Sequence, residues 1–426
     1  WTDEWGHRFS IKYDGLGRMI HWEGPESTQA PQSKQQWADF SYDTASQSVE
    51  KRTDRTRITQ RYDALGRLTY ISHHDLPSNA LAFEKKVDYD AGGSRVTTKI
   101  GSGASALEYV NYCDASGNVL IDDHGEGIVY RYSFDESGRP LFEQNPAGLS
   151  THYRYDALGR IQEKVLPSGS HVRFEYLNGG NRMELILSDK LKYISVRDIS
   201  GNIVYEGLQS PQGVTQEASY AYYMHGPHAG RLQRSTYLDG TQVEYTYDAW
   251  ANPISLKAYT ADAELSETID YTYDFCGRMT RASSTGHVWS KSTVVERAYD
   301  AYGQLVLEEV FLDGKKHASW TQAWDAEGMR TALITGRHTW CYDYNSVQLL
   351  TRIDDSWGRI YRFEYDDAAR LSKRITPWRT QTLTYAHKHR RPTLLETVAD
   401  EKPLLMQKVA YRLDQKVERV DIIFEG

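Results

Sequence analysis

The stretch Tyr155-Asp156-Ala157-Leu158-Gly159-Arg160-Ile161 decides the fold, because similar stretches recur along the chain. The clearest copies place Tyr, Asp, Gly and Arg at the same relative positions. These positions are Tyr13, Asp14, Gly17 and Arg18; Tyr62, Asp63, Gly66 and Arg67; Tyr155, Asp156, Gly159 and Arg160; and Tyr273, Asp274, Gly277 and Arg278. A motif that returns at a period of roughly 20 to 50 residues indicates a repeat architecture.

Looser copies of the motif extend the series over nearly the whole chain. Successive anchor residues stand between 20 and 29 residues apart. They are Asp14, Asp43, Asp63, Asp90, Asp114, Asp135, Asp156, Asn178, Asp198, Pro227, Asp248, Asp274, Asp300, Asp325, Asn345 and Asp366, with faint continuations near His387 and Arg412. We therefore predict that residues 1–426 form a single continuous array of about 16–18 units.

Each unit contains strand signals separated by two turn signals. Runs such as Thr151–Tyr155 and Val243–Tyr247 alternate apolar and polar residues, as strands do, and Gly, Pro, Asn and Asp bound them. A hairpin cannot bury its apolar face alone, but hairpins stacked side by side share a continuous sheet. Because sheets twist, so long a sheet must coil. The sequence predicts an all-β fold of tandem β-hairpins that form a long coiled β-sheet.

Every residue of the motif has a physical reason for its position. The Tyr ends a strand and offers its ring to the sheet and its hydroxyl to a neighbour. The Asp can accept backbone N–H groups in an Asx-turn, and the Gly suits a positive φ. The Arg can pair with an Asp of its own unit or of the next. Ala251 and Ala369 replace the Gly, so these turns should differ or carry strain.

Composition and charge exclude several classes of protein. The 50 Lys and Arg against 58 Asp and Glu give a net charge of -8, which provides no general attraction to nucleic acid. No apolar run approaches the roughly 18 residues of a membrane-spanning helix. The odd number of cysteines argues against a disulfide framework. The chain opens on Trp1 without a signal peptide, and we expect it to be a piece of a larger protein.

The repeated Tyr-Asp-x-x-Gly-Arg unit resembles the Rhs or YD-repeat family. That family includes shell proteins of bacterial insecticidal Tc toxin complexes, polymorphic Rhs toxins delivered by type VI secretion, and the extracellular barrels of teneurins. The resemblance implies a spiralling sheet that closes into part or all of a hollow shell, which in bacterial members holds a toxic segment until delivery. Bacterial shells usually end with an Asp-Pro motif associated with self-cleavage. No Asp-Pro dipeptide occurs in this sequence, so no self-cleavage residues are carried over.

From the repeat and the resemblance we predict a non-enzymatic encapsulating or scaffold segment of a bacterial Rhs or Tc-type toxin. It would shield a toxic polypeptide cargo before a bacterial secretion system delivers it. Its partners would be that cargo, in the same or a partner chain, and other shell segments. We predict no cofactor, no nucleic acid and no membrane span. The motif residues would build the wall, and no single residue would carry out chemistry.

Two other functions compete with this prediction. A surface adhesion or carbohydrate-binding module could use clustered Trp side chains to stack on sugar rings. The candidate clusters are Trp1, Trp5 and Trp22, and Trp320, Trp324 and Trp340. A glycan-acting enzyme on a repeat scaffold would need two carboxylates about 5–10 Å apart in a cleft. With 58 acidic residues, such pairs arise by chance.

The remaining candidate sites have simpler structural explanations. Three groups of His could begin a metal site, but none has a third ligand at the usual spacing, and we predict no metal. They are His73-His74-Asp75, His225 with His228, and His387 with His389. The basic run from Arg370 to Arg391 could bind an anion, but strand alternation would divide it between two faces. We predict that Cys113 and Cys276 pack against neighbours rather than react.

Overall fold

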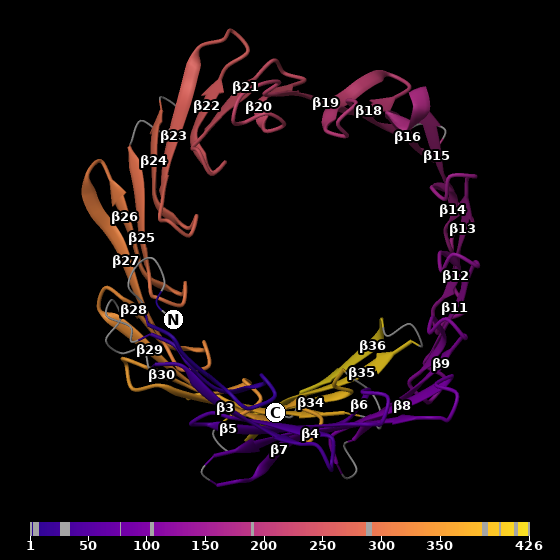
Figure 1. Cartoon of the computed structure of the whole chain (residues 1–426), viewed down its shortest axis with the longest axis vertical. Coiled ribbons are helices and arrows are strands. Elements are labelled where there is room, and N and C mark those ends of the chain that lie inside the picture. Colours follow the sequence, from indigo (N-terminus) through magenta and orange to yellow (C-terminus); the bar gives the residue numbers. More distant parts are fainter. Residues whose placement is uncertain are drawn as a thin grey trace. The chain divides into compact units, whose positions relative to one another are not determined.

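The computed structural model describes residues 2, 8–25, 35–76, 78–102, 106–188, 191–286, 292–385, 391–399, 402–412 and 416–424. Within these ranges the chain forms 36 β-strands of a single sheet and one short 3-10 helix, η2 (Asn178–Gly180). Strands that follow one another in the chain pair antiparallel, as Figure 1 lets the reader trace. The predicted all-β fold of tandem hairpins is confirmed.

The strands are short and close in sequence. The first twelve are β1 (Ser10–Tyr13), β2 (Met19–Glu23), β3 (Trp37–Asp43), β4 (Ser48–Arg52), β5 (Thr56–Tyr62), β6 (Leu68–Asp75), β7 (Leu81–Tyr89), β8 (Arg95–Ile100), β9 (Leu107–Cys113), β10 (Val119–Asp123), β11 (Val129–Phe134) and β12 (Pro140–Gln144). The next twelve are β13 (Ser150–Tyr155), β14 (Ile161–Val165), β15 (His171–Leu177), β16 (Arg182–Ser188), β17 (Leu191–Arg197), β18 (Ile203–Ser210), β19 (Gly213–Tyr222), β20 (Leu232–Tyr237), β21 (Gln242–Tyr247), β22 (Pro253–Tyr259), β23 (Leu265–Tyr273) and β24 (Met279–Gly286). The last twelve are β25 (Thr293–Tyr299), β26 (Leu305–Leu312), β27 (Lys315–Trp324), β28 (Arg330–Thr335), β29 (His338–Tyr344), β30 (Leu350–Asp355), β31 (Ile360–Tyr365), β32 (Leu371–Ile375), β33 (Thr380–Thr384), β34 (Leu394–Ala399), β35 (Lys402–Tyr411) and β36 (Val417–Ile423).

The chain divides into two compact units. The first comprises residues 1–149, 299–306 and 321–426, and the second comprises residues 150–298 and 307–320. The first unit therefore brings early and late strands of the chain together, whereas the second is built mainly from one stretch of consecutive hairpins. That residues 1–426 form one array of repeats stays a prediction.

The register of the hairpins shifts at the strand-end Tyr of the motif. Arg154 pairs with Glu163, but the next residue, Tyr155, pairs with Ile161, so Gln162 is an extra residue on the return strand. The same shift occurs at Tyr13, Tyr62 and Tyr273. A bulge of this kind re-aims side chains and increases the local twist. Each motif thus sets both the turn and the twist of its hairpin.

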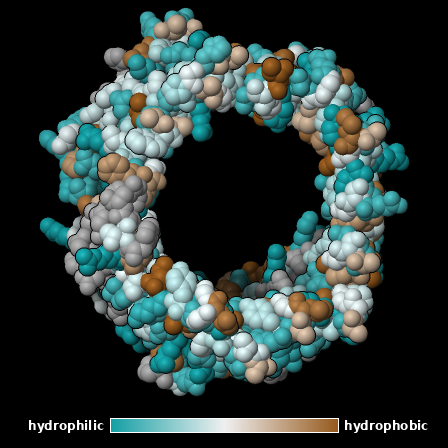
Figure 2. All heavy atoms as spheres, viewed as in Figure 1, coloured by the Kyte–Doolittle hydropathy of each residue, from teal (hydrophilic) through white to brown (hydrophobic). Residues whose placement is uncertain are grey.

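Among the described residues, neither unit has a large packed core. The accessible surface is 25509 Å², whereas a compact monomer of this mass exposes about 17,000 Å². The buried apolar side chains are mostly small; they are Ala38, Val87, Ala106, Leu107, Ile128, Ile194, Val306, Ala323, Ala326, Ala332 and Ala368. Figure 2 shows hydrophilic and hydrophobic side chains interspersed on the visible surface. Pairing between neighbouring strands and turns therefore carries most of the stabilisation.

Ala251 and Ala369, which replace the motif Gly, keep the turn geometry of the Gly-containing copies and carry strain. Ala251 and Ala369 have φ values of 69° and 62°, in the left-handed region. The N–H of Ala251 donates to the carbonyl of Asp248 at 3.0 Å, just as the N–H of Gly66 donates to Asp63 at 2.9 Å. A residue with a Cβ is disfavoured in that conformation by roughly 1–2 kcal/mol.

Replacing Ala251 by Gly should therefore stabilise the protein. Relief of strain exceeds the extra entropy of an unfolded Gly, so we expect a gain of about 0.5–1 kcal/mol in the free energy of unfolding. Gly66→Ala is the matched control, because an added Cβ would meet nothing within 4 Å and only the φ of 77° opposes it. We expect that control to destabilise. Urea-denaturation midpoints measure both effects, and a destabilising Ala251→Gly would contradict the account.

Candidate functional site

The Asp of each motif organises its own turn. One carboxylate oxygen of Asp156 accepts the N–H groups of Leu158 and Arg160, both at 2.9 Å. The other accepts Nε of Arg160 at 2.7 Å. The same bonds recur around Asp14, Asp63 and Asp274. The Arg therefore pairs with the Asp of its own unit, and the carboxylate is committed to the turn.

In four units the Arg also contacts the following unit. The guanidinium carbon of Arg160 lies 4.0 Å from the ring centroid of Tyr176, at the end of β15. The hydroxyl of that Tyr donates back to the carbonyl of Ile161 at 2.9 Å. The same pair of contacts joins Arg18, Tyr42 and Met19; Arg67, Tyr89 and Leu68; and Arg370, Tyr385 and Leu371. We call this arrangement the Arg–Tyr interlock.

Hydrogen bonding within the turn shifts the acidity of the motif carboxyls. The N–H of Arg160, and then its side chain, hold the pKa of Asp156 below its usual 3.8, with burial opposing. The pKa of Asp14, Asp63 and Asp135 is lowered in the same way. A lowered pKa contributes stability that is present above the unfolded value and is lost as the pH falls through the folded value. These turns should therefore weaken below about pH 4.

Asp156→Asn should show how much of the turn's stability comes from the negative charge of Asp156, because the variant removes the charge but can keep the backbone hydrogen bonds. Asn can still accept both backbone N–H groups, as Asn145 does from Ala147 and Leu149 at 3.0 Å. We expect the variant to be less stable than the parent at pH 7 and pH 5, and the difference to shrink at pH 3 as Asp156 becomes protonated. Urea midpoints at the three pH values measure this. A difference that persists unchanged at pH 3 would show that charge is not involved.

In the first unit, turns from the C-terminal part of the chain lie against loops from its N-terminal part. The ring of Tyr302 covers Gly24, where an added Cβ would come within 2.5 Å of it. The Tyr302 hydroxyl donates to the carbonyl of Pro25 at 2.7 Å and accepts the N–H of Gln36 at 3.0 Å. A Gly is therefore required at this early loop by the close approach of a late side chain.

The next contacts between the two parts of the chain are polar. Arg55 donates to the carboxylate of Asp325 at 2.5 Å and to the carbonyl of Tyr344 at 2.7 Å. Thr53 donates to Glu327 at 2.7 Å, and burial raises the pKa of Glu327. Asp325 is only 5% exposed, and Arg55 together with the N–H groups of its own turn supplies its hydrogen bonds.

Two further contacts join late turns to early loops. The carboxylate of Asp75 accepts the N–H of Ser346 at 3.0 Å. Gly101 has a φ of 80°, and a Cβ there would collide with the carbonyl of Asp367. Four turns late in the chain, at Asp300, Asp325, Asn345 and Asp366, thus contact four loops early in the chain, near Gly24, Thr53, Asp75 and Gly101. The hydrogen-bonded partners are 265 to 289 residues apart in the sequence. We call this the edge contact.

Burial separates the turns of the edge contact from other turns. Asp300, Ser346 and Ala368 are 2%, 5% and 8% exposed. By contrast, Leu65 and Leu158, at the same turn position as Ala368, are each 77% exposed. The sequence did not predict which turns would be covered, because the motif is similar in both groups.

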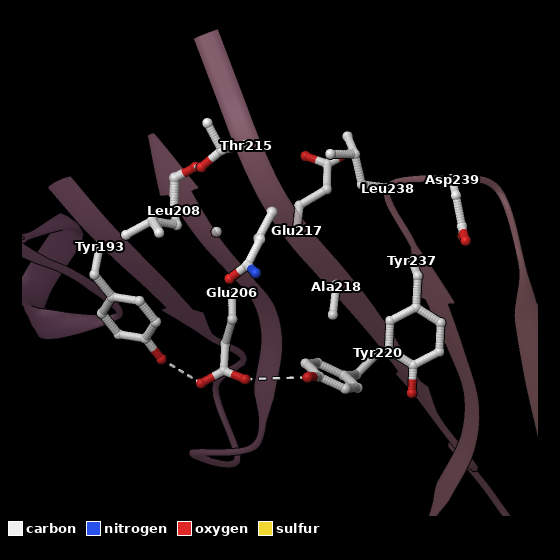
Figure 3. A pocket seen from close by; sticks show the side chains of 12 residues that line it. Tyr193, Glu206, Leu208, Thr215, Glu217, Ala218, Tyr220, Tyr237, Leu238 and Asp239 are labelled. Carbon is white, nitrogen blue, oxygen red and sulfur yellow. Dashed lines mark hydrogen bonds between the residues drawn. The ribbon is translucent and has the colours of Figure 1, made fainter. Parts of the chain in front are cut away.

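The second unit contains an open pocket of about 610 Å³. Figure 3 shows Glu206 between Tyr193 and Tyr220, with Tyr237 beside them. These residues come from β17, β18, β19 and β20. The sequence analysis did not single them out. The sequence shows only that Tyr and Glu residues occur on neighbouring strands. Which of them lie side by side depends on the strand register, which the sequence does not reveal.

The fold is similar to that of solved Tc toxin structures. One is the TcdB2-TccC3-Cdc42 structure, with a TM-score of 0.65 and 13% identity over 97% of this chain and 25% of that chain. Another is the Photorhabdus luminescens Tc holotoxin pore, with 0.67 and 13% over 97% and 25%. A third is TcdB2-TccC3 without its hypervariable C-terminal region, with 0.67 and 12% over 98% and 25%.

This chain spans about a quarter of the length of the structures it matches. No model of a known protein family matches it, and no curated protein sequence does. The likeness therefore concerns the fold. No described helix has the length and apolar character needed to cross a membrane.

The described members of the two Trp clusters are half-buried. They are Trp22, Trp320, Trp324 and Trp340, whereas Trp1 and Trp5 lie outside the described residues. Trp324 donates to the carbonyl of Leu305 at 3.0 Å, as a strand-end Tyr does in other units.

More exposed Trp side chains lie elsewhere. Trp357 and Trp378 are 51% and 60% exposed, and the Arg359 guanidinium carbon lies 4.9 and 5.5 Å from their ring centroids. Since Arg359 already contacts both rings, carbohydrate binding stays a prediction without a structural argument of its own.

The His candidates take part in packing. His73 packs edge-on against Phe83 at 5.6 Å, and burial lowers its pKa. His228 packs against Tyr223 and Tyr247. Over the described ranges, no three His, Cys, Asp or Glu side chains gather to hold a metal ion. His387 and His389 lie outside these ranges.

The basic run and the cysteines have ordinary surroundings. Lys373 and Arg374 are adjacent on β32, so they face opposite sides of the sheet. Lys388 and Arg390 lie outside the described residues. Cys113 is half-buried and, like Cys276 and Cys341, free. Cys276 is exposed, so the prediction that it packs is wrong; its turn position points to solvent.

Proposed function

We propose that this chain is a non-enzymatic wall segment of a bacterial Rhs or Tc-type toxin that shields a polypeptide cargo until a secretion system delivers it. The edge contact is the observation that carries this proposal. It joins a late stretch of a single-layered sheet to an early stretch through hydrogen bonds, a salt bridge and close Gly contacts. A sheet stacked on itself in this way forms a barrier without needing a packed core.

Two further observations support the proposal. The fold is similar to that of TcdB2-TccC3 structures, and the Tyr-Asp-x-x-Gly-Arg repeat resembles the Rhs family. The motif carboxylates are occupied by their own turns, as the bonds of Asp156 illustrate. They are therefore poor candidates for general acid–base catalysis, which needs a carboxyl within reach of a substrate.

Bare turns in the second unit indicate where further repeat segments would dock. Leu158, Ile199, Trp250 and Phe275 are 77%, 98%, 81% and 83% exposed. Each lies one or two residues after a motif Asp, where the edge contact of the first unit covers its turns. We propose that the loop edge of another repeat sheet covers them.

Limited proteolysis of the complete gene product, read by mass spectrometry, tests the shielding function. We expect a segment outside residues 1–426, or a co-purified partner polypeptide, to remain uncut while the repeats are intact. Gly101→Val should open the edge contact, because the side chain would collide with Asp367, and should expose that segment to protease. Gly66→Ala strains a turn away from the edge contact and should preserve protection. If no segment is protected, or if Gly101→Val leaves protection unchanged, the proposal is wrong.

A further inference from the structure

The pocket of the second unit is built on one face of four neighbouring strands. Tyr193 lies opposite Leu208, and Glu206 lies opposite Ala218, which in turn lies opposite Tyr237. Directly opposed residues, and residues two apart on one strand, point to the same face. The β-sheet register therefore places one carboxylate among three Tyr rings and two apolar side chains.

Glu206 is held by neutral hydrogen-bond donors. The hydroxyl of Tyr193 donates to one carboxylate oxygen, and that of Tyr220 donates to the other at 3.0 Å. Burial and then Glu206 raise the pKa of Tyr193, and they raise that of Tyr220 to about 12. Both hydroxyls therefore keep their protons at neutral pH and act as donors.

No Lys or Arg in the described part of the chain forms an ion pair with Glu206; Arg197, which acts on Tyr193 at longer range, donates to the carbonyl of Gly201 instead. By contrast, Glu184 pairs with Arg182 at 2.6 Å and with Lys192 at 2.7 Å. Glu184 lies opposite Ile194, the neighbour of Tyr193, and so it faces the other side of the sheet. The charge of Glu206 is available to a ligand, and charge-assisted hydrogen bonds are the stronger ones.

The remaining lining suits an aliphatic stem that carries a positive charge. Leu208, Ala218 and Leu238 provide apolar surface, and Tyr220 and Tyr237 provide rings whose faces attract cations. Glu217 and Asp239 add two further carboxylates to the lining. Lysine and arginine side chains combine an apolar stem with a charged end. A sugar hydroxyl could also donate to Glu206, but it would bring no positive charge to the carboxylate.

We propose that this pocket binds a lysine or arginine side chain of a polypeptide segment, with its charged end at Glu206 and its stem against Leu208 and Ala218. That the polypeptide is the shielded cargo rests on the proposed function. The binding itself does not, and it can be measured without cargo.

The test compares two capped amino acids of nearly equal shape, N-acetyl-arginine methylamide and its neutral analogue N-acetyl-citrulline methylamide. Titration calorimetry or NMR on the full chain should show that the arginine probe binds at least about tenfold more tightly. Glu206→Gln should abolish that preference. Glu244→Gln is the matched control, because Glu244 also accepts a Tyr hydroxyl, from Tyr259 at 3.2 Å, but lies outside the pocket lining. It should keep the preference.

A second variant keeps the test decisive if Glu206→Gln does not fold. Leu238 is 48% exposed in the lining, so Leu238→Lys should fold and should weaken arginine binding by supplying its own cation. Equal binding of the two probes, a preference that survives Glu206→Gln, unchanged binding in Leu238→Lys, or tighter binding of a neutral oligosaccharide would overturn the proposal. If arginine binding fails while the cargo stays protected, only this inference falls. If protection fails while arginine binds, the shielding function falls.

Discussion

The structure depends on the Arg–Tyr interlock between successive hairpins. Arg160 is fixed by Asp156 of its own turn and lies over Tyr176 of the next unit, whose hydroxyl returns to the carbonyl of Ile161. Each contact alone is a modest, partly exposed interaction. Because they recur at Arg18, Arg67, Arg160 and Arg370, they link each of these turns to the next hairpin. A sheet with few large buried side chains can then hold a defined twist.

The edge contact joins residues that are far apart in the sequence, whereas the Arg–Tyr interlock joins neighbouring hairpins. Strand pairing and the interlock connect residues within about one repeat period, whereas Arg55 and Asp325 are 270 residues apart. The contact uses the same turns that elsewhere lie exposed, such as those at Leu65 and Leu158. One motif therefore serves both as a hairpin connection and as a docking edge, and the residues after its Asp determine how well it docks.

The sequence predicted the structural features that depend on residues close together in the chain. Tyr, Asp, Gly and Arg at fixed spacing specify a hairpin turn, and their repetition specifies a sheet. The edge contact was not predictable, because nothing in the spacing relates Gly24 to Tyr302 or Gly101 to Asp367. The pocket was missed for a similar reason, since Glu206 meets Tyr193 and Tyr220 only through the register of three strands. Carbohydrate binding by the Trp clusters stays a prediction; of their members, Trp324 takes a strand-end position, where its ring N–H donates to the carbonyl of Leu305.

A double-mutant cycle on Arg160 and Tyr176 tests most directly whether the interlock couples neighbouring units. Arg160→Met and Tyr176→Leu keep apolar bulk while removing the cation and the aromatic hydroxyl. The account predicts that the two losses in unfolding free energy are not additive, with a coupling energy of about 0.5–1 kcal/mol. Additive losses would show that the two residues act independently, and the interlock would then not be what joins one hairpin to the next.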